Sequence, residues 1–105
     1  MNDKINKISV VMTSYNGEKY IREQLDSIIT NITENDELII GDDGSTDNTI
    51  SIIDEYLDKF PHIKLVKSQK LGTTNNLERL ISMTNGDIIF IADQDDVWDS
   101  QKVSK

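Results

Sequence analysis

The sequence contains no cysteine, a single proline and a single histidine, and it has no apolar run long enough to cross a membrane. Disulfide bonds and thiolate metal sites are therefore excluded, so any bound metal must use oxygen ligands or His62. His62 follows Pro61 in a connecting segment, and we expect it to be an ordinary surface residue. The lack of cysteine suits a reducing compartment. We expect a cytoplasmic protein, held at the inner face of the membrane only through regions or partners outside this chain.

Positive charge is also scarce. Eleven lysines and arginines stand against nineteen aspartates and glutamates, which gives a formal net charge of -8. Because affinity for nucleic acid comes mostly from Lys and Arg neutralising phosphates, we expect no nucleic-acid partner. An anionic small ligand remains compatible with this charge if a cation accompanies it. The length and the 36% hydrophobic content fit one domain, residues 1–105.

The sequence does contain short apolar runs that alternate with amphipathic segments, which is typical of consecutive βαβ units. Strands are expected at residues 7–13, 37–42, 63–67 and 87–92. Helices are expected at about 18–31, 46–59 and 74–83, where apolar residues recur at helical spacing. Lys64 interrupts the third strand, which we therefore place at an edge. The pattern predicts an α/β fold, a Rossmann-like three-layer sandwich with a mainly parallel sheet.

Polar residues follow the first, second and fourth predicted strands, at the point where each strand ends. They are the segments 14–17, 43–47 and 93–96. Right-handed crossovers bring the carboxyl ends of parallel strands to one edge of the sheet, and ligands of open α/β sheets bind at that edge. We therefore expect the three clusters to line one crevice.

The third cluster is the most unusual, because Asp93, Asp95 and Asp96 stand directly behind the apolar run 88–92. We expect that run to be a buried strand. Repulsion disfavours three neighbouring negative charges unless a cation or a set of donors compensates, and a hard divalent cation with oxygen ligands is the simplest compensator. A solvated acidic loop without a ligand is the alternative, and these residues alone leave it open.

The other two clusters have structural as well as functional interpretations. Residues 13–17 supply hydroxyls, an aromatic ring and an Asn-Gly pair that tolerates positive φ, which also describes an ordinary strand-to-helix turn. Gly44 would make a turn, Ser45 or Thr46 would cap the following helix, and Asp47 would suit its first turn. Asp42 and Asp43 have no such explanation. A carboxylate there can accept a hydrogen bond from a nucleobase imide N–H or a ribose hydroxyl.

Three segments resemble, in order, the motifs of family 2 glycosyltransferases. They are residues 9–17, residues 37–47 and the Asp-Gln-Asp-Asp-Val-Trp sequence at 93–98, and together they span nearly the whole chain. The last of them is most similar to bacterial rhamnosyltransferase-like members. The resemblance implies a GT-A fold, of which this chain would be the nucleotide-sugar-binding half.

Carried over by position, the resemblance implies a nucleotide site and a metal site. Thr13 and Tyr15 would lie against the nucleobase and ribose, and Asp43 would hydrogen-bond the base. Asp95 or Asp96 would ligate Mg²⁺ or Mn²⁺, since Mg²⁺ commonly takes one or two protein carboxylates plus substrate phosphates. The nucleotide-binding residues expected in this way are Thr13, Tyr15, Asn16, Asp42, Asp43 and Asp93.

The resemblance also implies a reaction, the transfer of a sugar from a UDP- or dTDP-linked donor to a saccharide or lipid-linked acceptor in bacterial surface polysaccharide synthesis. A divalent cation would stabilise the negative charge that develops on the diphosphate. Family members carry their catalytic base further downstream, whereas this chain stops at Lys105, so the catalytic residue is unknown. We expect a domain truncated at its C-terminus, with an uncovered apolar surface that predicts a homodimer.

Three alternatives remain. The first is a donor-binding fragment without catalysis of its own. The second is a haloacid dehalogenase-like phosphatase with Asp93 as nucleophile and Asp95 as acid, although that motif belongs on a first strand. The third is a receiver-like signalling module, which requires an acidic pair after the first strand, where this chain has residues 13–16 instead.

Overall fold

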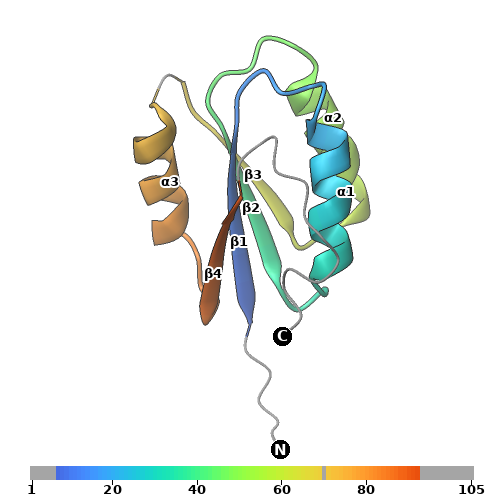
Figure 1. Ribbon diagram of the computed structural model, residues 1–105, viewed down its shortest axis with the longest axis vertical. Helices are drawn as coiled ribbons and strands as arrows, with labels where there is room; N and C mark the ends of the chain where they lie inside the picture. The colour runs from blue at the N-terminus through green and yellow to red at the C-terminus, as the bar shows by residue number, and fades with distance from the viewer. Residues whose placement is uncertain (1–6, 70, 93–105) are drawn as a thin grey trace, which may run out of the picture.

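The computed structural model describes residues 7–69 and 71–92 of the chain. Strands and helices alternate strictly: β1 (Ile8–Ser14), α1 (Ile21–Asn31), β2 (Glu37–Asp42), α2 (Thr49–Lys59), β3 (Ile63–Lys67), α3 (Thr73–Ser82) and β4 (Ile88–Ala92). The strands form one parallel sheet in the order β3-β2-β1-β4 (Figure 1). The expected three-layer α/β arrangement is confirmed, because α1 and α2 lie on one side of the sheet and α3 on the other. The edge position of β3 is confirmed as well.

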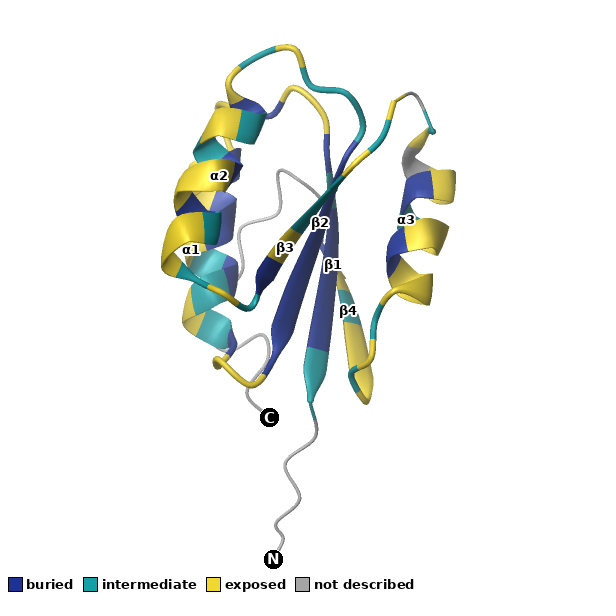
Figure 2. Ribbon diagram, turned by 180° about the vertical axis from the view of Figure 1, so that it is seen from behind, coloured by how far each residue is buried: buried dark blue, intermediate teal, exposed yellow. Residues whose placement is uncertain are grey.

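Successive residues of the central strands point to opposite sides of the sheet and enter two separate cores. Val10 and Met12 of β1 belong to the larger core beneath α1 and α2, whereas Val11 belongs to a smaller core beneath α3. Both sides of β1 and β2 are therefore covered, which explains their continuous apolar runs. Figure 2 shows these two strands buried over most of their length.

The helices end as expected, but two of them begin later. The carbonyl of Gly17 accepts the N–H groups of Tyr20 and Ile21, both at 2.9 Å, so residues 18–20 form a turn and α1 starts at Ile21. The expected cap of the second helix by residues 45–46 is wrong. The N-cap is Asn48, and the hydroxyl of Ser45 is bonded elsewhere. The second helix stops at Lys59, before the proline, as predicted. Within the described ranges, no helix is long and apolar enough to span a bilayer.

The expectation that β4 is a buried strand is wrong for most of its residues. Ile88, Ile89 and Ile91 are 41%, 40% and 50% exposed. Ile89 and Ile91 pair with Ser9 and Val11 on the side of the sheet that faces α3, and they are exposed because α3 packs over β1 and β2 and does not extend over β4 (Figure 2). The exposed side chains of Ile81 and Met83 from the end of α3 lie in the same part of the chain. We call Ile81, Met83, Ile89 and Ile91 the apolar strip; Ile88 pairs with Ile8 and lies on the other side of the sheet.

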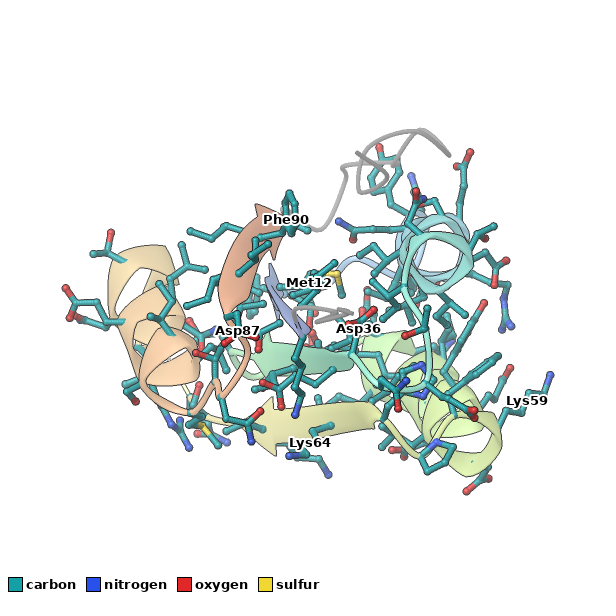
Figure 3. The ribbon with its side chains drawn as sticks, turned by 90° about the horizontal axis from the view of Figure 1, so that it is seen from below. Met12, Asp36, Lys59, Lys64, Asp87 and Phe90 are labelled. Atoms are coloured by element: carbon teal, nitrogen blue, oxygen red, sulfur yellow. The ribbon has the colours of Figure 1, made fainter. Side chains whose placement is uncertain are left out.

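Acidic side chains accept hydrogen bonds at the amino edge of the sheet, where the strands begin. Asp36 accepts the N–H of Ile8 at 2.9 Å and Asp87 accepts the N–H of Lys7 at 3.1 Å. Figure 3 shows these two aspartates on either side of the start of β1. At the same edge, the buried carboxylate of Glu37 accepts hydrogen bonds from the hydroxyl of Ser9 and from the backbone N–H of Asn85 in the loop before β4. These contacts connect the first, second and fourth strands.

The state of Glu37 predicts how stability depends on pH. Burial would raise its pKa, but the Ser9 hydroxyl, the Asn85 N–H and the nearby Lys7 and Lys64 together lower it. A carboxyl group whose folded-state pKa is lowered stabilises the fold above its unfolded-state pKa, and this contribution is lost as the pH falls through the folded-state value. We therefore expect the urea midpoint to fall between about pH 5 and about pH 3.

The Glu37→Gln variant should be less stable than the parent at neutral pH and should show a smaller fall of the urea midpoint on acidification. Glu34→Gln is the matched control, because Glu34 is an exposed residue of the preceding loop. Equal acid dependence of the parent and Glu37→Gln would contradict this account.

Candidate functional site

The loops that follow β1, β2 and β3 meet at the carboxyl edge of the sheet, at the top of Figure 1. Two of the three predicted polar clusters lie together there. The N–H of Asn16 donates to the hydroxyl of Ser45 at 2.8 Å, and the N–H of Thr46 donates to the side-chain oxygen of Asn16 at 2.8 Å. The third cluster, residues 93–96, lies outside the described residues. It follows Ala92, the last residue of β4, which is paired with Met12 of β1.

Asn16 has a positive φ of 49°, as its Asn-Gly sequence indicated. Its side-chain oxygen accepts from the N–H groups of Thr46 and Asp47, and its own N–H is used as well. The amide of Asn16 thus joins the β1–α1 loop to the β2–α2 loop. In this structure its oxygen is engaged by the protein itself.

A second set of bonds joins the same two loops on the side of α2. The buried hydroxyl of Thr49 accepts the N–H of Gly17 at 2.9 Å and donates to Asp47. Asp47 also accepts the N–H of Glu18, whose carboxylate accepts the N–H of Asn48 in return. Burial would raise the pKa of Asp47, but the bonds from Thr49 and Glu18 lower it overall. We call residues 14–18 and 42–49 the paired loops.

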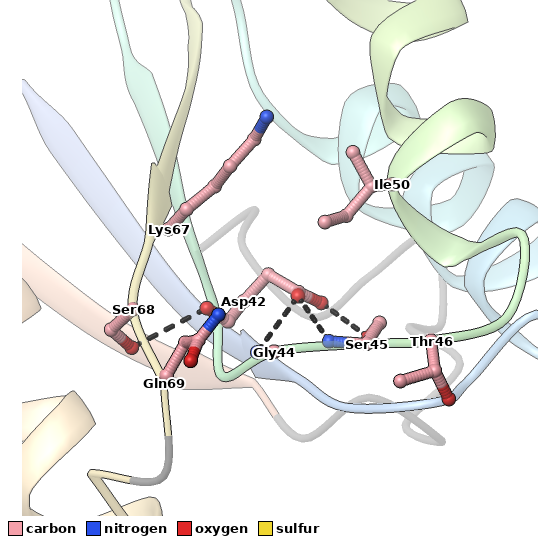
Figure 4. Close-up of a pocket in the computed structure, with 8 residues that line it drawn as sticks. All are labelled: Asp42, Gly44, Ser45, Thr46, Ile50, Lys67, Ser68 and Gln69. Atoms are coloured by element: carbon pink, nitrogen blue, oxygen red, sulfur yellow. Dashed lines mark hydrogen bonds between the residues drawn. The ribbon is translucent and has the colours of Figure 1, made fainter.

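Asp42 is fully buried at the end of β2, on the side of the sheet that faces α1 and α2. One carboxylate oxygen accepts the hydroxyls of Ser14 at 2.7 Å and Ser45 at 2.6 Å. The other accepts the N–H groups of Gly44 at 3.1 Å and Ser45 at 2.8 Å (Figure 4). A carboxylate has about four lone-pair positions, so the chain itself occupies all of them.

Asp43 follows one residue later and contacts the opposite side, where α3 begins. Its Oδ1 accepts the hydroxyl of Ser68 at 3.1 Å and the N–H of Leu71 at 2.7 Å, and its Oδ2 accepts the N–H of Gly72 at 3.0 Å. The Leu71 bond lowers the pKa of Asp43 most; burial opposes it, and Gly72 and Ser68 add to it. The half-buried carboxylate is therefore held ionised, and the described residues leave one acceptor position on Oδ2.

Thr13 and Tyr15 complete the described part of the predicted nucleotide site. Thr13 is half-buried and paired with Gly41 of β2, and strand alternation places it on the side of Val11, which faces α3. Tyr15 directly follows β1 and is 52% exposed. An exposed aromatic ring, a hydroxyl and an ionised carboxylate thus occur at the ends of β1 and β2.

The partners of Asp43 were missed by sequence reasoning. Leu71 and Gly72 act through backbone N–H groups, which nearly every residue type supplies, so their side chains carried no signal. The available signal was Gly72 itself, whose φ of +85° is a conformation that favours glycine.

A cavity of about 350 Å³ opens beside Asp42 (Figure 4). It is lined by Asp42, Gly44, Ser45, Thr46, Ile50, Lys67, Ser68 and Gln69. Lys67 and Ile50 point into it from β3 and α2. The Asp42 carboxylate beside this cavity is already engaged by Ser14, Gly44 and Ser45.

The order of these motifs on this sheet is matched by a known family. The sequence model of the family described as glycosyl transferase family 2 matches residues 9–105 of this chain. The chain belongs to glycosyl transferase family 2. The resemblance seen in the sequence is thereby confirmed, and the phosphatase and receiver-like alternatives are set aside.

This family 2 domain is 41% identical over 98 residues to the dTDP-rhamnosyl transferase RfbG of Shigella flexneri, over 88% of this chain and 34% of the relative. It is similar in structure to the mannosyltransferase PcManGT of Pyrobaculum calidifontis in complex with GDP-Man and Mn²⁺. The TM-score is 0.82 at 26% identity, over 91% of this chain and 29% of that one. Residues 1–349 of S. aureus TarS with UDP-GlcNAc give a TM-score of 0.81 at 28% identity, over 90% and 28% of the two chains. The chain spans about a third of the length of the curated relatives it matches.

Proposed function

We propose that this domain binds a nucleoside diphosphate sugar at the carboxyl edge of its sheet, as the donor-binding part of a glycosyltransferase. The observation that carries the proposal is the state of Asp43. Its carboxylate is oriented by three donors of the β3–α3 loop, keeps one acceptor position that no described residue fills, and lies near the end of β1, where Thr13 and Tyr15 stand. The nucleotide-sugar complexes of PcManGT and TarS support it.

Each exposed group has a defined part in this proposal. The remaining acceptor position of Asp43 takes the imide N–H of uracil or thymine, which favours UDP- or dTDP-linked donors over a cytosine nucleotide that lacks this donor. Tyr15 provides a face on which the base stacks. Thr13 supplies a hydroxyl beside them. Asp42 and Asn16, whose oxygens are engaged within the paired loops, contribute by shaping the site rather than by touching the nucleotide.

The acidic segment after β4 fits a divalent cation in its chemistry. Its carboxylates are hard oxygen donors, and they follow Ala92, which is paired with the strand that carries Thr13. We assign Asp95 and Asp96 to Mg²⁺ or Mn²⁺ and Asp93 to the ribose. The cation supplies positive charge that stabilises the diphosphate leaving group. These carboxylates would hold the cation.

The acceptor side of the reaction belongs to the same proposal. We infer a saccharide or lipid-linked acceptor in surface polysaccharide synthesis from the resemblance of the motifs, whereas the name of RfbG, a dTDP-rhamnosyl transferase, supports the dTDP-linked donor alone. The catalytic base remains unassigned within residues 1–105. Donor binding without transfer is therefore the alternative, and an assay of sugar transfer by the 105-residue chain separates the two.

Calorimetric titration tests the proposal directly. UDP and dTDP are titrated with and without Mn²⁺ into the parent, into Asp43→Asn and into the double variant Asp95→Ala, Asp96→Ala. We expect binding that strengthens with Mn²⁺, becomes weaker in Asp43→Asn, and loses its metal dependence in the double variant. A folded parent that binds neither nucleotide would overturn the proposal.

Tyr15→Ala is expected to weaken UDP binding about tenfold, because base–aromatic stacking contributes about 1–3 kcal/mol per base. Tyr20→Ala is the matched control. Tyr20 is 50% exposed on the same loop but lies at the start of α1, and its loss should leave the affinity unchanged. Equal losses in the two variants would mean that general loop disturbance, and not stacking, explains the effect.

We also propose that the apolar strip supports a homodimer, since an exposed patch of this kind commonly marks an interaction surface. Ile89→Lys with Ile91→Lys places charge on the two positions of the strip that belong to β4 and is expected to give a monomer. Analytical ultracentrifugation of the parent and the variant measures this. A parent that sediments as a monomer at tens of micromolar would refute the dimer.

A further inference from the structure

Asn76 is a buried polar residue that the proposed reaction does not use. It lies in α3, faces the sheet and is 1% exposed. Its side-chain nitrogen donates to the carbonyl of Gly41 at 2.9 Å, while its side-chain oxygen is buried without a hydrogen-bond partner among the described residues. Since an unpaired buried polar atom is costly, this amide calls for an explanation beyond simple packing.

The absence of a side chain at Gly41 leaves the space that the Asn76 amide occupies. A Cβ atom at position 41 would lie 2.5 Å from the side-chain oxygen of Asn76 and 3.0 Å from both terminal carbons of Leu80. The amide therefore rests directly on the backbone of β2, at the residue that pairs with Thr13. The contact fixes the position of the first half of α3 along the axis of β2, and we call this position the height of α3.

That height matters because α3 begins at the loop that holds Asp43. The backbone N–H of Asn76 donates to the carbonyl of Gly72 at 2.9 Å, and the N–H groups of Gly72 and Leu71 donate to the Asp43 carboxylate. A chain of contacts thus runs from the carbonyl of Gly41 through α3 and the β3–α3 loop to Asp43, the residue that follows β2.

We propose that Asn76 is a positioning residue for Asp43. Its amide sets the height of α3 on β2, and this height keeps the N–H groups of the β3–α3 loop directed at the carboxylate. The effect on the Asp43 carboxylate is independent of any ligand. The consequence for nucleotide affinity rests on the function proposed above.

The test compares Asn76→Asp and Asn76→Ala with Leu77→Ala. Asn76→Asp keeps the size of the side chain but turns an oxygen toward the Gly41 carbonyl in place of the donor. Asn76→Ala removes the amide without adding charge, and it serves if the aspartate variant does not fold. Leu77 packs in the smaller core from the same helix, so Leu77→Ala weakens the packing of α3 while keeping the amide.

Three measurements are made on each folded variant. Carbon-detected NMR titration follows the pKa of Asp43, proton NMR follows the hydrogen-bonded N–H groups of Leu71 and Gly72, and calorimetry gives the affinity for UDP. In both Asn76 variants we expect the pKa of Asp43 to rise toward its ordinary value and the two N–H resonances to move upfield. We expect UDP binding to weaken about threefold or more. Leu77→Ala should leave all three unchanged.

The inference is overturned if both Asn76 variants keep the pKa and the N–H resonances of the parent, because the amide would then only stabilise the packing of α3. The same outcome in Leu77→Ala and in the Asn76 variants also overturns it. If the parent binds no UDP, the proposed function fails, and the NMR measurements still decide the role of Asn76.

Discussion

Asp42→Ala is expected to lower the free energy of unfolding by about 4 kcal/mol. The substitution leaves four donors around a fully buried position without an acceptor, two from hydroxyls and two from backbone N–H groups. Each unsatisfied buried group costs about 1–3 kcal/mol, and relaxation of the turn at Gly44 and Ser45 recovers part of the total. Urea denaturation followed by circular dichroism measures the loss.

Two further variants separate the causes of that loss. Asp42→Asn keeps the size and one oxygen but directs an amide nitrogen at donors, so we expect about half the effect of alanine. Asp43→Asn changes the same residue type one position later, where the carboxylate is half-buried, and its main effect should be on nucleotide affinity. If Asp42→Ala loses less than about 1 kcal/mol, the buried network does not stabilise the fold.

The second large effect is expected for Gly86→Ala, which should lower the free energy of unfolding by about 2–3 kcal/mol. A Cβ atom at position 86 would lie 2.4 Å from the hydroxyl oxygen of Ser9, 2.8 Å from its backbone nitrogen and 3.0 Å from the carbonyl oxygen of Lys7. Two of these three atoms belong to the backbone of the segment that starts β1, so a rotamer change cannot relieve the contact. The loop before β4 must move instead, which disturbs the pairing of β4 with β1.

Three further variants test this account of Gly86→Ala. They are the double variant Ser9→Ala, Gly86→Ala, the single variant Ser9→Ala, and the control Asn85→Ala. Removing the Ser9 hydroxyl relieves only the side-chain part of the contact, so we expect the double variant to remain less stable than Ser9→Ala alone. Asn85 is exposed, and its truncation should change stability by less than about 0.5 kcal/mol. Thermal and urea unfolding of the parent and the four variants (Gly86→Ala, Ser9→Ala, the double variant and Asn85→Ala) measure these differences. Full recovery in the double variant would show that the backbone contacts do not matter.

Asp42 and Asp43 show what sequence reasoning could and could not reach in this domain. The two residues were assigned together to the nucleotide, yet period-2 alternation along β2 sends their side chains to opposite sides of the sheet. That separation was available from the sequence, because Ile40 and Asp42 share one side. The choice of which aspartate stays available for a ligand was not, since it depends on hydroxyls and N–H groups that come from three other segments.

The fold itself followed from hydrophobic periodicity, which is a local signal. The apolar runs predicted the strands to within one residue, whereas the starts of α1 and α2 were placed about three residues too early. At both starts the backbone forms turns that bond to the neighbouring loop, and such long-range bonds leave no periodic trace. The exposure of β4 had the same origin, because an apolar run shows that a strand favours burial but not which element covers it.

The paired loops limit how loops can be grafted between related enzymes. Residues 14–18 and 42–49 satisfy each other's backbone groups through Asn16, Thr49 and Asp47. A graft that replaces one loop with that of a relative therefore removes partners from the other. The two segments act as a single module, and a chimera that keeps its turn geometry must inherit both from the same parent.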